Sequence, residues 1–222
     1  MNTMRRMSLA LCMAVVSLSA SESGSSDNMI GRQSHNEGLK ALPAPAAVVI
    51  DGDLSDWDWS GRIEVFADNA LRGRYSVEMA AMWDAERIYL AAKWNDPTPM
   101  FSMIDPRFNP DKGWKSDAWQ MRVLTDRSIH ISAWNFTPKN ESCLSISYAK
   151  NGSHPAAVIC DENGLAKNGI RMKYLKGENG TSYSQEISIP WSFLYKKVPE
   201  ISSGFTFRLG NEFLWGDVSG KT

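Results

Sequence analysis

Cysteine, histidine and long apolar runs are scarce in this chain of 222 residues. It contains three cysteines and three histidines, which are scattered and form no Cys/His metal cluster. Its longest apolar run, Met7 to Ala20, is shorter than the roughly 18 residues of a membrane span. We therefore expect a mature chain without a membrane span.

An excess of charge of either sign is also missing. The 24 Lys and Arg residues nearly balance the 25 Asp and Glu residues, which gives a formal net charge of −1. Acids and bases alternate along the chain, so no basic patch favours nucleic acid or an anionic membrane surface. We expect no nucleic-acid partner.

The common catalytic signatures do not occur. There is no H-E-x-x-H, no G-x-S-x-G and no Gly-rich phosphate loop before a helix. Asp117 and Glu186 could act as a pair on a glycosidic bond, but such pairs of acids occur in most strand-rich domains. The sequence predicts a protein that has no catalytic centre of its own.

The first 46 residues differ from the rest. Arg5 and Arg6 precede the apolar run, and the small residues Ser19 and Ala20 follow it, which is the order of a signal peptide. Residues 1–20 are therefore predicted to direct the chain to the periplasm or the exterior. Residues 21–46 are rich in Ser, Gly, Asn and Pro without a period, which predicts a flexible tether. Residues 47–222 remain as one domain.

Short alternating apolar runs separated by Gly, Asn, Asp and Pro predict strands in this domain. No run of helical period exceeds a few turns. The number and spacing of the strands favour an all-β fold, a two-sheet antiparallel β-sandwich of immunoglobulin-like type. The expected strands are Ala47–Ile50, Arg62–Phe66, Val77–Trp83, Ile88–Trp94, Ala118–Leu124, Ile129–Asn135, Leu144–Ala149, Ala156–Cys160, Ile170–Leu175, Ser182–Ile189 and Phe205–Phe213.

One hairpin brings two cysteines together in this prediction. Asn151-Gly152 is a favoured type I′ turn, and it pairs residues whose numbers sum to 303. Cys143 and Cys160 satisfy this sum, so in an oxidising compartment they are predicted to form a disulfide. Pro155 counts against the register because it cannot donate a ladder hydrogen bond. Two reduced, half-buried cysteines are the alternative.

Five segments together resemble a known superfamily. They are IDGDLSDWDWSG (Ile50–Gly61), MWDAERIYLAAKWNDPTP (Met82–Pro99), WKSDAWQMRV (Trp114–Val123), YSQEISIPWSFL (Tyr183–Leu194) and GFTFRLGNEF (Gly204–Phe213). Their order resembles the DOMON-like superfamily. This superfamily contains type-nine carbohydrate-binding modules and the haem b-binding domain of the ethylbenzene and dimethylsulfide dehydrogenase gamma subunits. The resemblance implies a β-sandwich, in agreement with the strand pattern.

The segments point to two branches of that superfamily. Lys93–Thr98 is similar to the W-x-D-P-T segment of the haem branch, and His130–Phe136 is similar to its Trp-rich strand. Glu186–Leu194 is closer to the E-x-x-I-P-W segment of the carbohydrate modules. The longer matches favour haem b and electron transfer to a redox partner protein. The alternative is a carbohydrate-binding module that attaches to polysaccharide.

The haem resemblance implies one Met and one Lys as axial ligands. Met100 and Met103 follow the W-x-D-P-T-like segment on a proline-rich loop. Lys196 and Lys197 follow the I-P-W segment and are the expected lysines. The alternative for the methionines is packing in the core.

A sugar site needs flat aromatic faces beside amides or carboxylates, and the chain has nine tryptophans. The alternative is that most of them fill the core. The loop from Asn95 to Trp114 is expected to form one wall of the site for either ligand, because prolines restrict it and exposed aromatics lie on it. The expected ligand-binding residues are Trp94, Asp96, Trp114, Trp134 and Trp191.

Acidic residues are dense at the start of the domain. Asp51, Asp53 and Asp56 could bind calcium through oxygen ligands. This segment lacks the spacing of an EF-hand, and Asx-turns are the more common role of such aspartates.

Overall fold

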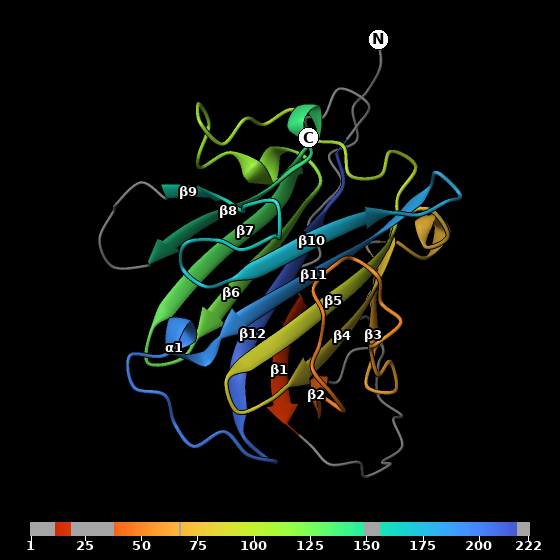
Figure 1. Ribbon diagram of the computed structural model, residues 1–222. Helices are drawn as coiled ribbons and strands as arrows, with labels where there is room; N and C mark the ends of the chain where they lie inside the picture. Colours follow the sequence, from red (N-terminus) through yellow and green to blue (C-terminus); the bar gives the residue numbers. More distant parts are fainter. Residues whose placement is uncertain (1–11, 19–37, 67, 149–155, 217–222) are drawn as a thin grey trace.

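The computed structural model describes residues 12–18, 38–66, 68–148 and 156–216. Nearly all regular structure in these ranges is β-strand, and the strands form a two-sheet β-sandwich (Figure 1). The predicted all-β fold is confirmed. The short helix α1 (Trp191–Leu194) and the 3-10 turns η1 (Asn69–Leu71), η2 (Gly113–Lys115) and η3 (Thr137–Lys139) connect strands. No helix in the described ranges is long and apolar enough to cross a membrane.

The first sheet has the strand order β10, β11, β5, β4. The bounds are β10 (Arg171–Lys176), β11 (Ser182–Pro190), β5 (Arg87–Asn95) and β4 (Ser76–Trp83). Two short strands share the free edge of β4: β3 (Ile63–Phe66) pairs antiparallel with its first half, and β2 (Leu39–Pro43) pairs parallel with its last residues.

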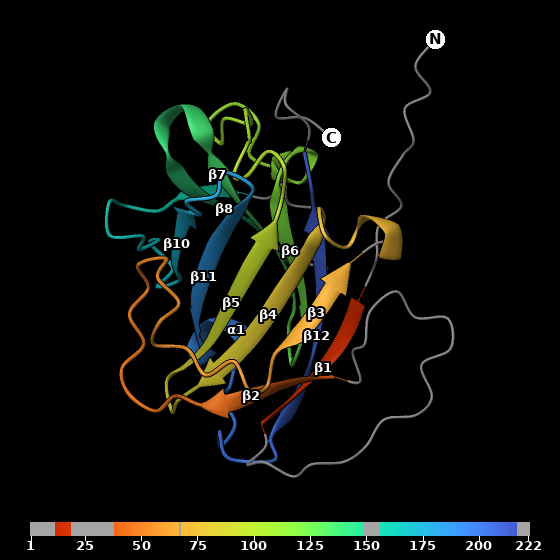
Figure 2. The same ribbon diagram turned by 90° about the vertical axis from the view of Figure 1, so that its right-hand side faces the viewer.

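The second sheet has the strand order β12, β6, β7, β8, β9, and all its pairings are antiparallel. The bounds are β12 (Thr206–Leu214), β6 (Ala118–Leu124), β7 (Ser128–Phe136), β8 (Glu141–Tyr148) and β9 (Ala156–Ile159). Strand β1 (Cys12–Leu18) pairs antiparallel with β12 and parallel with β2, so it joins the two sheets along one side (Figure 2).

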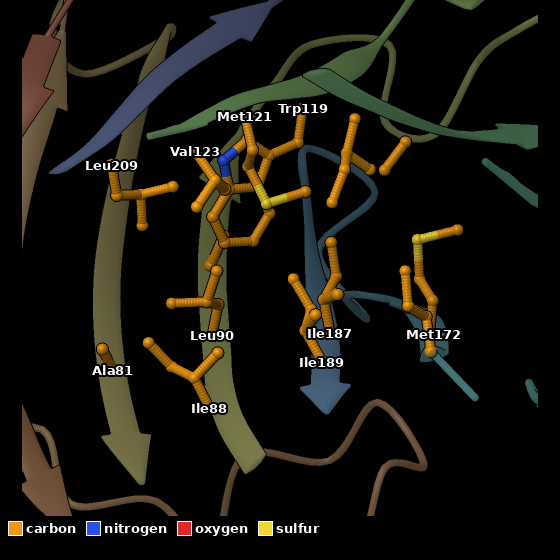
Figure 3. Packing of buried hydrophobic residues seen from close by; sticks show 14 of the residues in the cluster. Ala81, Ile88, Leu90, Trp119, Met121, Val123, Met172, Ile187, Ile189 and Leu209 are labelled. Atoms are coloured by element: carbon orange, nitrogen blue, oxygen red, sulfur yellow. The ribbon is translucent and has the colours of Figure 1, made fainter. Parts of the chain in front are cut away.

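The main core fills the space between the two sheets. Trp119, Met121 and Val123 alternate along β6 and are almost completely buried. They belong to the same apolar cluster as Ile88 and Leu90 of β5 (Figure 3). Because side chains of a strand alternate between its two faces, the remaining residues of these strands point to the outer faces of the sandwich.

Each outer face is partly covered by a long connection. Residues 44–59, here the cover segment, cross the first sheet, where Trp57 packs with Ala80, Met82 and Ala91. Residues 96–117, here the proline loop, cross the second sheet, where the Trp134 indole donates a 2.9 Å hydrogen bond to the carbonyl of Ile104. Both connections therefore cover apolar clusters of their own, separate from the main core.

The beginning of the sandwich differs from the prediction. Within the predicted tether, Leu39 and Ala41 of β2 are completely buried, because the two residues alternate along a strand that contributes to the core. The expected strand Ala47–Ile50 is wrong, since Val48 and Ile50 pack on the outer cluster instead. Of the predicted signal peptide, the structure describes only β1, and the rest lies outside the described residues.

The predicted disulfide between Cys143 and Cys160 is wrong in this structure, where both thiols are free. Cys143 pairs with Ile159, so the register of the hairpin sums to 302 rather than 303. A shift of one residue moves a side chain to the other face of a strand. Cys143 accordingly lies in the cluster under the proline loop and Cys160 in the main core. Burial raises the pKa of each thiol to about 12.

Candidate functional site

A groove of about 600 Å³ lies on the outer face of the first sheet. Its floor follows one row of the strand register: Glu64 of β3, Glu78 of β4, Lys93 of β5, Ser184 of β11 and Leu175 of β10. Because all five side chains lie on the face that points away from the main core, the groove is polar and open to solvent. We call it the sheet groove. Its other lining residues are Gly52, Asp53, Leu54, Trp94, Asn95, Lys176, Gly177, Asn179, Ser182 and Tyr183.

One wall of the sheet groove is held by a buried carboxylate. Glu186 Oε2 accepts hydrogen bonds from the backbone N–H groups of Asp51 and Gly52, and its Oε1 accepts one of 2.6 Å from the Trp57 indole. Burial raises the pKa of Glu186 to about 7, against the opposing effect of these hydrogen bonds. The cover segment is thus tied to the middle of β11.

Gly52 brings this wall close to the edge of the sheet. Its φ is +96°, and a Cβ there would lie 2.7 Å from the Cβ of Leu175. Glycine is the residue that tolerates both the positive φ and the close approach. The wall is therefore fixed at both ends, by Glu186 at the centre of the sheet and by Leu175 on β10.

The two acids on the groove floor are each bound to an arginine. Glu78 Oε1 is 3.1 Å from Arg62 Nε, and Glu64 forms an ion pair with Arg72. Both arginines are well exposed, so these pairs contribute little to stability. Their effect is on the charge of the groove, because the negative charge of each acid is balanced by an arginine.

Lys93 is the central cation of the sheet groove. Its ammonium lies 4.0 Å from the centroid of the Trp59 ring, a cation–π contact. Among the described residues no carboxylate forms an ion pair with it. The N–H groups of Lys93 are thus available to a ligand, beside the apolar surface of Trp59, Leu54 and Leu175.

Asp96, a predicted ligand-binding residue, is instead buried at the base of the proline loop. It accepts a 2.8 Å hydrogen bond from the backbone N–H of Thr98. Its neighbour Asp117 accepts backbone hydrogen bonds from Phe101 and Gly216. Burial raises the pKa of both acids, that of Asp117 to about 8 with a further contribution from Asp96. This pair fixes the loop to the end of β12.

Three of the predicted ligand-binding tryptophans have structural roles. Trp94 stacks on Tyr183 in the main core, with ring centroids 5.0 Å apart. Trp134 lies under the proline loop. At the other end of the sandwich, the indole N–H of Trp191 in α1 donates a hydrogen bond to the carbonyl of Asp84. All three residues are at most 1% exposed. In this structure they therefore pack in apolar clusters, which is the alternative role given above. Trp114 is 42% exposed and remains accessible to a ligand.

The residues predicted as haem ligands are not brought together. Met100 is buried in the main core and Met103 is exposed on the proline loop, which follows β5. Lys196 and Lys197 follow β11 and α1. Since β5 and β11 are antiparallel over their whole length, eight residue steps, or about 26 Å, separate the two regions along the strands. The structure thus places the two sets near opposite ends of these strands.

The aspartates predicted to bind calcium accept hydrogen bonds from backbone N–H groups of the cover segment. Asp51 Oδ1 accepts a hydrogen bond from the backbone N–H of Asp53, and Asp53 Oδ1 accepts one from the backbone N–H of Ser55. Asp56 Oδ2 accepts one from the backbone N–H of Val49. Within the described ranges, no group of three or more His, Cys, Asp or Glu side chains is placed to hold a metal ion. The alternative role in Asx-turns is observed for Asp51 and Asp53, whereas Asp56 links the cover segment back to Val49.

Apart from Trp94, the residues that line the sheet groove are not among the predicted ligand-binding residues. Lys93 and Ser184 lie within segments that resemble the superfamily, but neither is a characteristic residue of those segments, and Glu78 lies in none of them. Only the pairing of β4 with β5 and of β5 with β11 places them side by side. The signal that could have found them was their outward position in the alternating pattern.

Comparison with known proteins gives one structural likeness of interest. No protein-family model matches the chain, and no curated protein sequence matches it either. The chain is similar in fold to a family 9 carbohydrate-binding module from Caldicellulosiruptor kristjanssonii, solved in complex with glucose. The TM-score is 0.46 at 14% sequence identity, over 81% of this chain and 80% of that one.

Proposed function

We propose that this protein is a carbohydrate-binding module that holds its ligand in the sheet groove. The observation that carries the proposal is the row of side chains from Glu64 to Leu175 across five neighbouring strands. Strands fix such side chains more firmly than free loops do, which lowers the cost of ordering them around a ligand.

The chemistry of the groove suits sugar hydroxyls, which both donate and accept hydrogen bonds. Lys93 supplies donors. The amide of Asn95 donates to Ser76 Oγ, which leaves its carbonyl oxygen as an acceptor. Leu54 and the half-exposed Leu175 supply apolar surface for the C–H faces of a sugar ring.

Binding without turnover is part of the proposal. Asp117 and Glu186, the two acids considered for catalysis, are buried under the proline loop and the cover segment, and neither lines the groove. Glu64 and Glu78 do line it, but each is engaged by an arginine. The predicted export of the chain would place the module where polysaccharides occur, at the cell exterior or in the periplasm.

Affinity gel electrophoresis against a panel of soluble polysaccharides tests this function. We expect at least one polysaccharide to retard the protein, and we expect Lys93→Met and Asn95→Ala to remove the retardation without changing the far-UV spectrum. Lys197→Met is the matched control, because that lysine lies outside the groove and should leave retardation unchanged.

Two results would contradict the proposal. One is the absence of retardation by every polysaccharide; the other is unchanged retardation of a folded Lys93→Met, Asn95→Ala double variant. The haem prediction is checked on the same protein, since a Soret band after expression with added haem would favour that function instead.

A further inference from the structure

A second groove, of about 460 Å³, lies on the other side of strand β10. It runs between the region of η3 and the connection from β9 to β10, and we call it the edge groove. Like the sheet groove, it combines amides, lysines, acids and a tyrosine. Its lining residues are Asn135, Lys139, Asn140, Glu141, Ser142, Cys160, Asp161, Glu162, Lys173 and Tyr174.

The two grooves meet at β10. Leu175 and Lys176 line the sheet groove, whereas Lys173 and Tyr174, the two residues before them on the same strand, line the edge groove. Strand β10 is the last strand of its sheet, so no further strand stands between the grooves. Leu175, 49% exposed, is the apolar residue at the crossing point.

We propose that one extended oligosaccharide occupies both grooves and crosses β10 over Leu175. This inference rests on the proposed function and specifies the ligand as a chain rather than a single sugar. The floor of the sheet groove alone spans four strand spacings, about 19 Å, which is longer than one sugar ring. A ligand of several rings is needed to fill it and to reach Lys173.

The free edge of β10 does not favour a peptide strand as the occupant. Met172 donates its backbone N–H to the carbonyl of Gly164, and Leu165 forms a bridge with Arg171. Lys173 Nζ donates to the carbonyl of Glu162. These contacts of residues 162–165 occupy the first half of the edge, so a peptide would have few free backbone groups to pair with.

Titration calorimetry with a length series from one retained polysaccharide tests the inference. We expect the affinity to rise at least about tenfold from the disaccharide to the hexasaccharide, equivalent to about 1.4 kcal/mol. Two variants should lose this gain while they keep the disaccharide affinity. Lys173→Met removes the ammonium, and Asn140→Gly removes the amide while tolerating the positive φ of 51° at that residue.

The controls separate this inference from the function itself. Lys167→Met, on the same connection but outside both grooves, should leave the whole series unchanged. Equal affinity for all lengths, or an undiminished gain in the folded Lys173→Met, Asn140→Gly double variant, would overturn the crossing of β10 and leave the sheet groove intact. Failure of every length to bind would instead overturn the proposed function.

Discussion

Two carboxyl groups, those of Asp96 and Asp117, adjoin at the buried base of the proline loop. Both oxygens of Asp117 accept hydrogen bonds from backbone N–H groups, and the side chains of Asp96 and Asp117 are in hydrogen-bonding contact with each other. Two adjoining buried acids do not both ionise readily. The raised pKa of the pair therefore means that it retains a proton near neutral pH, up to about pH 8.

This pair predicts how stability depends on pH. The pKa of Asp117 in the folded protein, about 8, exceeds its ordinary value of 3.8, so between these values the folded state holds more protons. Its contribution to stability is complete below pH 3.8 and is lost as pH rises towards about 8, by about 1.4 kcal/mol per pH unit for one proton. We expect Asp96→Asn to flatten this slope, because a neutral amide replaces the carboxyl group beside Asp117.

Urea unfolding at several pH values measures the slope. Glu186, whose pKa is also raised, changes stability in the same direction, so the relevant quantity is the difference between wild type and variant. Glu200→Gln, at an exposed acid, is the control. Parallel curves for wild type and Asp96→Asn would show that the pair does not hold a proton.

Glu186 supports a second prediction at the residue scale. In Glu186→Gln, one carboxylate oxygen that accepts hydrogen bonds is replaced by an amide that donates them. The N–H groups of Asp51 and Gly52, or the indole of Trp57, then lose their acceptor. We expect a loss of about 1–3 kcal/mol of unfolding free energy and weaker polysaccharide retardation. Glu178→Gln, on an exposed turn, should change neither quantity.

The proline loop packs on the second sheet through a glycine. A Cβ at Gly113 would lie 2.2 Å from the Trp134 ring, so η2 rests directly on the indole. Gly113→Ala must displace the ring or the loop, and we expect a destabilisation of about 1–3 kcal/mol. Gly73→Ala is the control, since nothing lies within 4 Å of its Cβ position. The melting temperatures of both variants measure this effect, and equal melting temperatures would contradict the packing of η2 on Trp134.

At the scale of whole elements, the alternating pattern predicted most strands well. Ala118–Leu124 has the same bounds in the structure, and the other strands from β3 onwards differ from the prediction by a few residues. The same pattern missed β2, because its alternation is too short to stand out in a segment rich in Ser and Pro. Pattern alone shows which residues share a face, but it does not show which strands are neighbours.

Register was the limit of prediction for the sites. The predicted pairing of Cys143 with Cys160 assumes a two-residue turn at Asn151-Gly152. In the structure Cys143 pairs with Ile159, so the register differs from the prediction by one residue. That turn lies outside the described residues. The sheet groove needs the register of β4, β5 and β11 together, and β11 is about ninety residues further along the chain than β5. Local sequence contains no information on such a pairing.

The whole molecule is a sandwich whose two outer faces are each partly covered by connecting chain. The cover segment leaves the row from Glu64 to Leu175 open on the first sheet. The position of the candidate site thus follows from where the cover ends, and Glu186 fixes that boundary.

Strand β1 provides a test of the predicted signal peptide. Removal of residues 1–20 would also remove β1, while β12 keeps β6 and β2 keeps β4 as partners. We expect a chain that starts at Ser21 to melt within about 4 °C of the full-length chain, which corresponds to less than about 1 kcal/mol, and to retain polysaccharide binding. N-terminal sequencing of the exported protein locates the cleavage. An unfolded truncated chain would show that β1 belongs to the mature domain.

The positions of the two cysteines make them separate reporters of local opening. Cys143 becomes accessible when the proline loop lifts from the second sheet, whereas Cys160 belongs to the main core and borders the edge groove. Segments that cover a small cluster generally open at lower free energy than a central core does. Under native conditions we therefore expect modification of Cys143 by a thiol reagent to require opening of the proline loop and modification of Cys160 to be independent of that loop, as measured by mass spectrometry of single-cysteine variants. Gly113→Ala should accelerate only the first reaction, and equal acceleration of both would mean that the loop and the sandwich open together.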